Sequence, residues 1–127
     1  MSATFTNNSS PATENDNQLL PVADFNVARQ TVDNDRELFE EIVKMFMEDS
    51  PALLQGIKDG FSSGNTEIVR RNAHTLKSQV AIFAAERSRQ AAERVEHLAG
   101  QEGCNEAINK LVIAMDELHS TIASYEW

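Results

Sequence analysis

Hydrophobic residues recur at intervals of three, four and seven along most of the chain, which is the spacing of an α-helix with one buried face. The first long run of this kind contains Phe39, Ile42, Val43, Phe46, Leu53, Leu54, Ile57 and Phe61. The strict alternation of apolar and polar residues that marks a half-buried β-strand does not occur anywhere in the chain. The sequence therefore predicts an all-α protein.

Local signals divide this first run into two helices. Ser50 followed by Pro51 is a good N-cap and first helical residue, because the N–H that proline lacks has no helical partner at that position. We therefore expect two nearly continuous helices, 34–49 and 51–62, with a kink between them. The stretch 60–65, which contains glycine, serine and asparagine, ends the second helix.

The histidine-bearing part of the chain forms the next long helix, which Asn65 caps. Its buried stripe consists of Val69, Ala73, Leu76, Val80 and Phe83. Continuing this stripe would bury Arg87, so we expect the helix to break near 84–86. The following helix ends at Gly100 and Gly103. The last helix presents one apolar face, made of Ile108, Leu111, Val112, Met115, Leu118 and Ile122. This pattern favours an antiparallel four-helix bundle with one or two short accessory helices at the N-terminus.

The start of the chain differs in composition from the rest. Residues 1–20 are rich in Ser, Thr and Asn and almost free of apolar side chains before Leu19, so we expect a flexible tail. Order begins at about residue 21, where Asp24 can cap a short helix, and the bundle domain is expected to span 21–127. The starting methionine and the tail favour a free-standing protein over one domain cut from a longer protein.

Charge and composition exclude several classes of function. A net charge of −9 argues against nucleic-acid binding, whose affinity comes largely from basic side chains at phosphates. No apolar stretch approaches the ~18 residues that a membrane span needs. The single cysteine, Cys104, cannot form an internal disulfide, which fits a cytoplasmic location. We also expect no cofactor, because there is no nucleotide-binding loop and the three histidines lack metal-ligand spacing, and we expect a monomer.

His74 is the most informative polar residue. No acid lies between Ile68 and Ala85, although the chain contains 20 acidic residues. On a helix, the neighbours of His74 three and four residues away are Arg70, Arg71, Lys77 and Ser78, and the small residue Ala81 follows one turn later. Nearby cations favour the neutral imidazole, which is a nucleophile, and they would also stabilise a phosphoryl group attached to it.

The other candidate features favour structural roles. His97 lies off the apolar face made by Val95 and Leu98, and His119 borders the face made by Met115 and Leu118. Neither has the motif that surrounds His74, so we interpret both as solvated or structural. Gly56, Gly60 and Gly64 recur every four residues, and we interpret them as turn and helix-end residues.

The run Ala73-His74-Thr75-Leu76-Lys77 resembles the A-H-x-L-K-G signature of histidine-containing phosphotransfer (HPt) domains of two-component phosphorelays. The resemblance extends over about residues 22–123, including the helix that contains Glu37 to Phe46 and the segment from Ala91 to Glu96. It implies that His74 is the phosphoacceptor and that Lys77 supports the phosphoryl group.

The resemblance also implies the partners and the reaction. These would be receiver domains of response regulators, a hybrid histidine kinase, or both. A receiver aspartyl phosphate would donate its phosphoryl group to His74, and a second receiver would accept it, with Mg²⁺ held by the receiver. The chain would then be a phosphotransfer intermediary with no ATP site, not an enzyme. The expected docking surface contains Arg70, Arg71, Ser78 and Ala81.

Two positions depart from the family pattern. Ser78 stands where the family usually has the glycine that lets a receiver approach closely, and Ala84 replaces a second usual glycine. Three other functions therefore remain open. The first is a histidine kinase dimerisation domain, although its usual motif has Glu after the histidine and Pro soon afterwards. The second is a helical adaptor that binds receiver or kinase domains without phosphotransfer, and the third is a purely structural bundle.

Overall fold

The computed structural model describes residues 19–127, so the expected flexible tail lies outside the described residues except for Leu19 and Leu20. The described part contains five helices and no strand: α2 (Phe25–Thr31), α3 (Arg36–Ser63), α4 (Thr66–Ala81), α5 (Glu86–Leu98) and α6 (Cys104–Ala123). The prediction of an all-α protein is confirmed. Within these residues, no helix is both long enough and apolar enough to cross a membrane.

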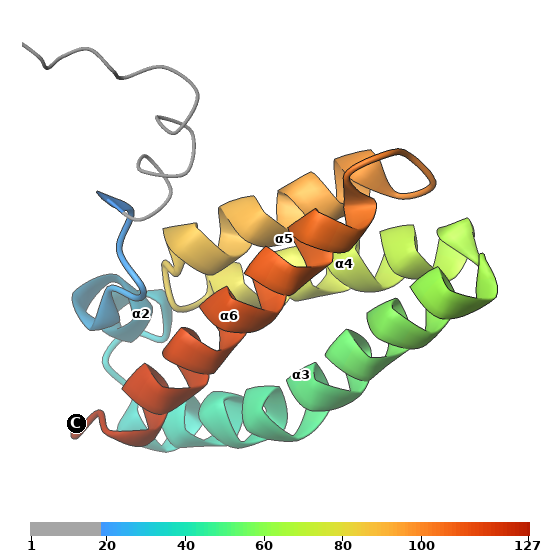
Figure 1. The fold of residues 1–127 in the computed structure, drawn as a ribbon. Coiled ribbons are helices and arrows are strands. Elements are labelled where there is room, and N and C mark those ends of the chain that lie inside the picture. The colour runs from blue at the N-terminus through green and yellow to red at the C-terminus, as the bar shows by residue number, and fades with distance from the viewer. Residues whose placement is uncertain (1–18) are drawn as a thin grey trace, which may run out of the picture.

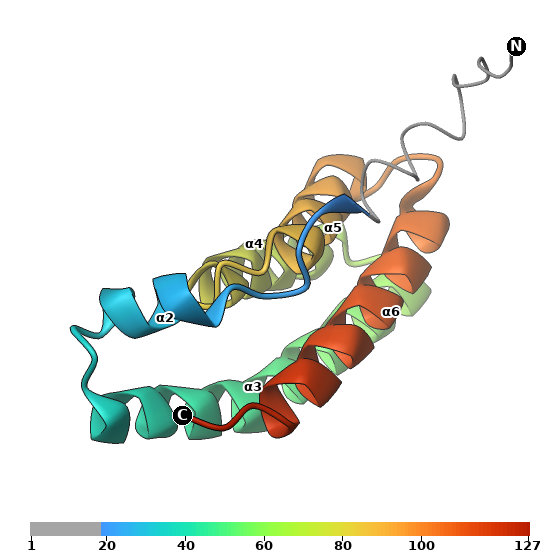
Figure 2. The ribbon, with the colours of Figure 1, turned by 90° about the vertical axis from the view of Figure 1, so that its left-hand side faces the viewer.

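The four long helices form an antiparallel bundle (Figure 1). α4 packs between α3 and α5, α5 packs between α4 and α6, and a smaller contact between α6 and α3 completes the bundle. The short helix α2 lies at the end of the bundle where α3 begins, and the C-terminus lies at the same end (Figure 2). The expected four-helix bundle with a short accessory helix is therefore observed.

The core follows the apolar stripes that the sequence predicts. The stripe of α4 is completely buried or nearly so and consists of Val69, Ala73, Leu76 and Val80. Phe83, just beyond α4, is also fully buried. Complete burial of a side chain such as Leu76 stabilises the fold by about 1.5–3 kcal/mol. Because α4 turns this stripe inward, the residues on its opposite side face solvent.

The prediction of two helices around Pro51 is wrong. α3 is a single helix with Pro51 inside it. Proline in a helix interior removes one hydrogen bond and costs about 3 kcal/mol. Phe46 and Ile57 on either side of Pro51 are both buried and lie roughly three turns apart, on the same face of one helix. Burial of this continuous face outweighs the local cost. Ser50 is consequently not an N-cap: it is fully buried in mid-helix.

The interpretation of the three glycines is only partly right. Gly64 ends α3 with a φ of 74°, as a helix-end glycine does. Gly56 lies inside α3, where an added Cβ would collide with Nδ2 of Asn72 on α4. Gly60 also lies inside α3, and a Cβ there would be 3.2 Å from Val69 Cγ2. These two glycines let α3 and α4 approach each other closely.

The break after the histidine helix occurs where the sequence places it. α4 ends at Ala81, α5 begins at Glu86, and Ala84 in the turn has a φ of 50°. This left-handed conformation is unfavourable for a residue with a Cβ, which explains why glycine suits the position. Two of the predicted caps are also observed: Asp24 accepts hydrogen bonds from the first turn of α2, and Asn65 accepts one from Ile68 N at 3.2 Å.

Candidate functional site

His74 lies on the solvent side of α4, and 61% of its side chain is exposed. The buried neighbours Ala73 and Leu76 determine this orientation, because they turn one face of α4 into the core. α5 runs antiparallel to α4 (Figure 1). The imidazole contacts Glu96 of α5. The site is thus built from two packed helices and does not depend on a loop.

Glu96 of α5 contacts both predicted site residues of α4. Its Oε2 lies 2.9 Å from Nδ1 of His74, and its Oε1 lies 2.9 Å from Nζ of Lys77. The side chains of Glu96 and Lys77 are 21% and 25% exposed, so they are much less solvated than that of His74. The two helices therefore place one carboxylate between a histidine and a lysine.

The contacts among Glu96, Lys77 and His74 determine which nitrogen of the neutral imidazole carries the proton. The hydrogen bond with Lys77 lowers the pKa of the Glu96 carboxyl most strongly, burial opposes this effect, and the contact with His74 lowers the pKa further. Glu96 is thus ionised at neutral pH and can only accept hydrogen bonds. The neutral imidazole must then carry its proton on Nδ1, which leaves a lone pair on Nε2. That nitrogen can act as a nucleophile towards an external group.

The absence of acids around His74 holds only along the segment 68–85, because Glu96 of α5 lies beside the imidazole. The other acids of α5 include Glu86 and Glu93, which pair with Arg89 at 2.8 and 3.2 Å and not with His74. The proximity of Glu96 to His74 could not be predicted from the sequence, because it depends on the register between two helices. The sequence signal for this contact was a carboxylate on the side of α5 that faces α4. Helical spacing within one segment does not show which residues of two packed helices lie side by side.

The expected docking residues all lie on the exposed surface of α4. Arg70, Arg71, Ser78 and Ala81 are exposed, although Arg70 also pairs with Glu67 at 3.1 Å. The Ser78 hydroxyl donates to the carbonyl of His74 at 3.4 Å, so its side chain lies against its own helix. Positions 78 and 81, which follow His74 on the exposed side of α4, consequently carry short side chains.

His97 and His119 have no comparable surroundings. His97 is exposed near the end of α5. His119 is half-buried on α6, with Nε2 2.8 Å from the hydroxyl of the fully buried Ser50. Burial lowers the pKa of His119, while nearby Asp116 opposes the shift. The pair joins α6 to α3, so His119 is structural. Among the described residues, no group of three or more His, Cys, Asp or Glu side chains could hold a metal ion.

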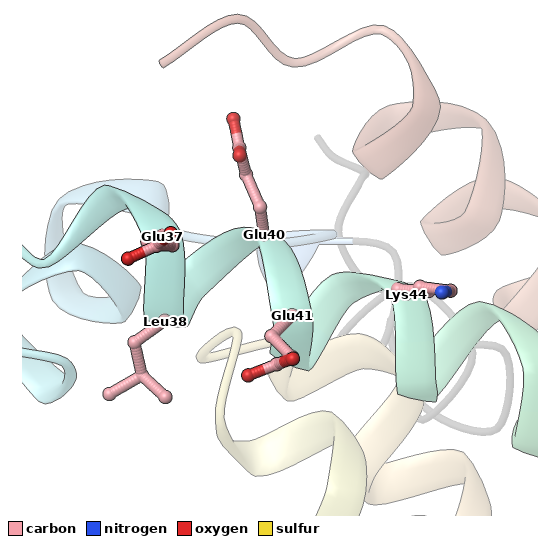
Figure 3. Close-up of a pocket in the computed structure, with 5 residues that line it drawn as sticks. All are labelled: Glu37, Leu38, Glu40, Glu41 and Lys44. Carbon is pink, nitrogen blue, oxygen red and sulfur yellow. The ribbon is translucent and has the colours of Figure 1, made fainter.

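Two surface hollows of the described residues do not provide a second site. One is lined by Glu37, Leu38, Glu40, Glu41 and Lys44. All five come from a single helix, and their side chains spread apart instead of converging (Figure 3). Another hollow lies between α3 and the C-terminal residues, including Tyr125 and Trp127. Neither contains a residue of α4 or α5, so the exposed surface around His74 is the candidate site.

One family of known proteins matches more than half of the chain. The family model of the Hpt domain matches residues 41–124, a span that includes His74, Lys77 and Glu96. No curated protein and no solved structure matches the chain at a significant level.

Proposed function

Because the chain belongs to the Hpt domain family, whose model matches more than half of it, we propose that it carries phosphoryl groups in a phosphorelay on His74. A receiver domain would donate the group from its aspartyl phosphate, and another receiver would accept it. The observation that supports this role is the exposed imidazole with Nδ1 at 2.9 Å from Glu96, which leaves Nε2 as the nucleophilic nitrogen.

The proposed docking surface is the exposed side of α4 around His74. Arg70 and Arg71 lie one turn before the imidazole and can attract the acidic site of a receiver. Ser78 and Ala81 follow it and leave room for a partner backbone, because both side chains are small. The receiver would supply Mg²⁺, so the chain itself needs to provide the nucleophile and the surface. A hybrid histidine kinase could present such a receiver.

Lys77 has a more complex role than the sequence suggests. In the unphosphorylated protein its Nζ is 2.9 Å from Glu96 Oε1, so it is already engaged. A lysine ammonium has three N–H donors, and one bond to Glu96 leaves others for a phosphoryl oxygen. We assign Lys77 both tasks: it neutralises Glu96 before transfer and contacts the phosphoryl group afterwards.

The test is incubation of the purified protein with a panel of phosphorylated receiver domains. The carrier function predicts an acid-labile, base-stable label on the protein and its transfer to a second receiver. Binding without labelling by any receiver would favour the adaptor instead. Incubation with radiolabelled ATP and Mg²⁺ alone should leave the protein unlabelled, because a carrier needs a phosphorylated partner. Stoichiometric labelling by ATP would contradict the carrier function in favour of a kinase.

A further inference from the structure

The cations around His74 differ in their partners. Nζ of Lys77 is 2.9 Å from a carboxylate of α5, and Nη1 of Arg70 is 3.1 Å from Oε1 of Glu67. Arg71 is exposed, and its guanidinium has no hydrogen bond or ion pair with any of the described residues. Of the three cations that the sequence places around His74, Arg71 is therefore the one whose charge no carboxylate offsets.

Arg71 also lies on a different side of His74 from the other two cations. Successive residues of an α-helix are separated by about 100°, so Arg71 lies about 60° to one side of His74. Arg70 and Lys77 lie about 40° and about 60° to the other side. The contact between Lys77 and the α5 carboxylate shows that this second side faces α5. Arg71 consequently occupies the side that is turned away from α5.

The reactive nitrogen of His74 is directed toward the side on which Arg71 lies. Nδ1 is 2.9 Å from Glu96 of α5, and the two ring nitrogens point in divergent directions, so Nε2 is directed away from α5. The imidazole also leans toward the N-terminus of α4, as helical side chains do, which places it over the turn that contains Arg71. A group bound to Nε2 would therefore lie within reach of the long side chain at position 71.

We propose that Arg71 is a further catalytic residue, whose guanidinium contacts the phosphoryl group at Nε2 of His74. This inference rests on the proposed function and deepens it, because it gives Arg71 a task beyond the attraction of a receiver. A guanidinium presents its N–H donors in a planar fork that matches two phosphoryl oxygens, whereas a lysine ammonium acts as a point charge. Lys77 stays beside Glu96 on one side of the ring, and Arg71 approaches the phosphoryl group from the other side.

The transfer that Arg71 assists is balanced in atoms and electrons. The lone pair of His74 Nε2 attacks the phosphorus of a receiver aspartyl phosphate, and the bond between phosphorus and the aspartyl oxygen breaks. The electron pair of that bond stays on the aspartate carboxylate, and the proton on Nδ1 remains in place. During transfer, negative charge is spread over the three equatorial oxygens of the phosphoryl group. Arg71 donates N–H bonds to these oxygens and keeps its own protons, so it lowers the barrier in both directions.

The test compares Arg71→Gln and Arg71→Lys with the control Arg94→Gln. Arg94 is an exposed arginine of α5 whose side chain also has no partner among the described residues. It lies two residues before Glu96 and hence on roughly the opposite side of α5. Since positions 71 and 94 are both exposed, all three variants should fold, and circular dichroism and melting temperature establish this first.

The first readout is single-turnover transfer at a saturating concentration of phosphorylated receiver, where association no longer limits the rate. Arg71→Gln should be roughly 10-fold slower or more, because a charge-assisted hydrogen bond to the migrating group is lost. Arg71→Lys should recover part of the rate, since it keeps the charge and loses the fork. Arg94→Gln should transfer at the parent rate. A rate for Arg71→Gln that equals the parent rate at saturation would overturn the proposal, because Arg71 would then only attract the receiver.

The second readout needs no receiver. Phosphoramidate is a small phosphoryl donor that labels exposed imidazoles, and the phosphorus NMR signal that is missing in His74→Gln identifies the group on His74. A guanidinium in contact with this group favours its dianionic form and lowers its pKa. The pKa of the phosphoryl group should be about 0.5–1 higher in Arg71→Gln than in the parent, and unchanged in Arg94→Gln. Equal pKa values in the parent and Arg71→Gln would overturn the proposal, as would a parent in which phosphoramidate leaves His74 unlabelled.

The two readouts separate the failure of this proposal from the failure of the proposed function. If no receiver labels the parent although the pKa of the phosphoryl group depends on Arg71, the carrier function fails and the contact with Arg71 stands. If receivers label the parent and Arg71→Gln at equal rates at saturation, the carrier function stands and the catalytic role of Arg71 fails.

Discussion

His74 and His119 have the same side chain in opposite surroundings. His74 is 61% exposed and contacts the ionised carboxylate of Glu96, whereas His119 is half-buried and contacts the neutral hydroxyl of Ser50. The first contact sets the form of a reactive ring, and the second joins α3 to α6 through the middle of the bundle. The chemistry available to a histidine here therefore depends on its partner and its exposure.

The two regions also differ in what a substitution should change. Around His74, a substitution should alter phosphotransfer and leave the fold nearly intact, because the site lies on the outer surface of α4 and α5. Around His119, a substitution should alter stability and leave phosphotransfer intact, because Ser50 and Phe46 are buried there. Three variants or conditions test this difference, and a fourth tests the turn that follows α4.

The largest effect is expected for Ser78→Arg. The side chain at position 78 lies one turn beyond His74, and a long one would stand between the imidazole and a docking receiver. Transfer should fall by about 100-fold or more, which corresponds to about 2.7 kcal/mol of activation free energy. Stability should change by no more than about 0.5 kcal/mol, because the position is exposed.

Two controls accompany Ser78→Arg. Ser120→Arg makes the same change at an exposed position of α6 and should transfer at the parent rate. Ser78→Gly should transfer at least as fast as the parent while losing about 0.5–1 kcal/mol of stability. Fast transfer by Ser78→Arg would show that receivers do not dock over this turn of α4.

Lys77→Ala should slow transfer by roughly 10- to 100-fold, because a charge-assisted hydrogen bond contributes about 1.5–3 kcal/mol. Its loss of stability should be about 1 kcal/mol or less, since the pair with Glu96 is partly exposed. Lys58→Ala removes an exposed lysine of α3 as the control. Single-turnover kinetics with a phosphorylated receiver measure the transfer rates of the parent and of both variants. Equal rates for both variants would exclude a role for Lys77 in transfer.

The pH dependence of stability tests the surroundings of His119. Because burial lowers its pKa in the folded protein, the unfolded chain binds this proton more tightly. The stabilisation is complete above the ordinary histidine pKa of about 6.5 and is lost as the pH falls below it, by at most about 1.4 kcal/mol per pH unit. Melting temperatures from pH 8 to pH 5 measure this loss. In His119→Gln the loss of stability at low pH should be smaller. Melting temperatures that depend on pH in the same way as those of the parent would contradict burial of His119 as the cause of the loss.

The smallest expected effect is a gain in stability for Ala84→Gly. Ala84 has a φ of 50°, which costs a residue with a Cβ about 1–2 kcal/mol and glycine very little. Part of this gain is offset because glycine is more flexible in the unfolded chain, so we expect a net gain of about 0.5–1 kcal/mol. Urea unfolding measures it, and Ala99→Gly, with a φ of −57°, should show no gain. Equal stability of Ala84→Gly and the parent would contradict strain at Ala84.

Much of the fold can be predicted from the sequence because helical periodicity and caps are local signals. The stripe from Val69 to Phe83 predicts the buried face of α4, and the charge at Arg87 predicts the break before α5. Continuity through Pro51 could not be predicted, because the burial of Phe46 and Ile57 on one face overrides the local signal. Ser50 was mistaken for a cap for the same reason.

The candidate site could be predicted only as far as one helix determines it. The spacing of Arg70, Lys77 and Ser78 around His74 follows from the geometry of α4. The contact between His74 and Glu96 does not, because it depends on how far α5 slides along α4 in the packed bundle. That contact changes the interpretation of Lys77, which the sequence assigned to the phosphoryl group alone.

The most direct test of the account is site-specific labelling. The parent, His74→Gln, His97→Gln and His119→Gln are each incubated with a phosphorylated receiver that labels the parent, and the acid-labile label is measured in folded protein. If His74 is the phosphoacceptor, the label should disappear only in His74→Gln and persist in the other two variants, because only His74 combines exposure with the Glu96 contact. Label that persists in His74→Gln and disappears in His97→Gln or His119→Gln would contradict it.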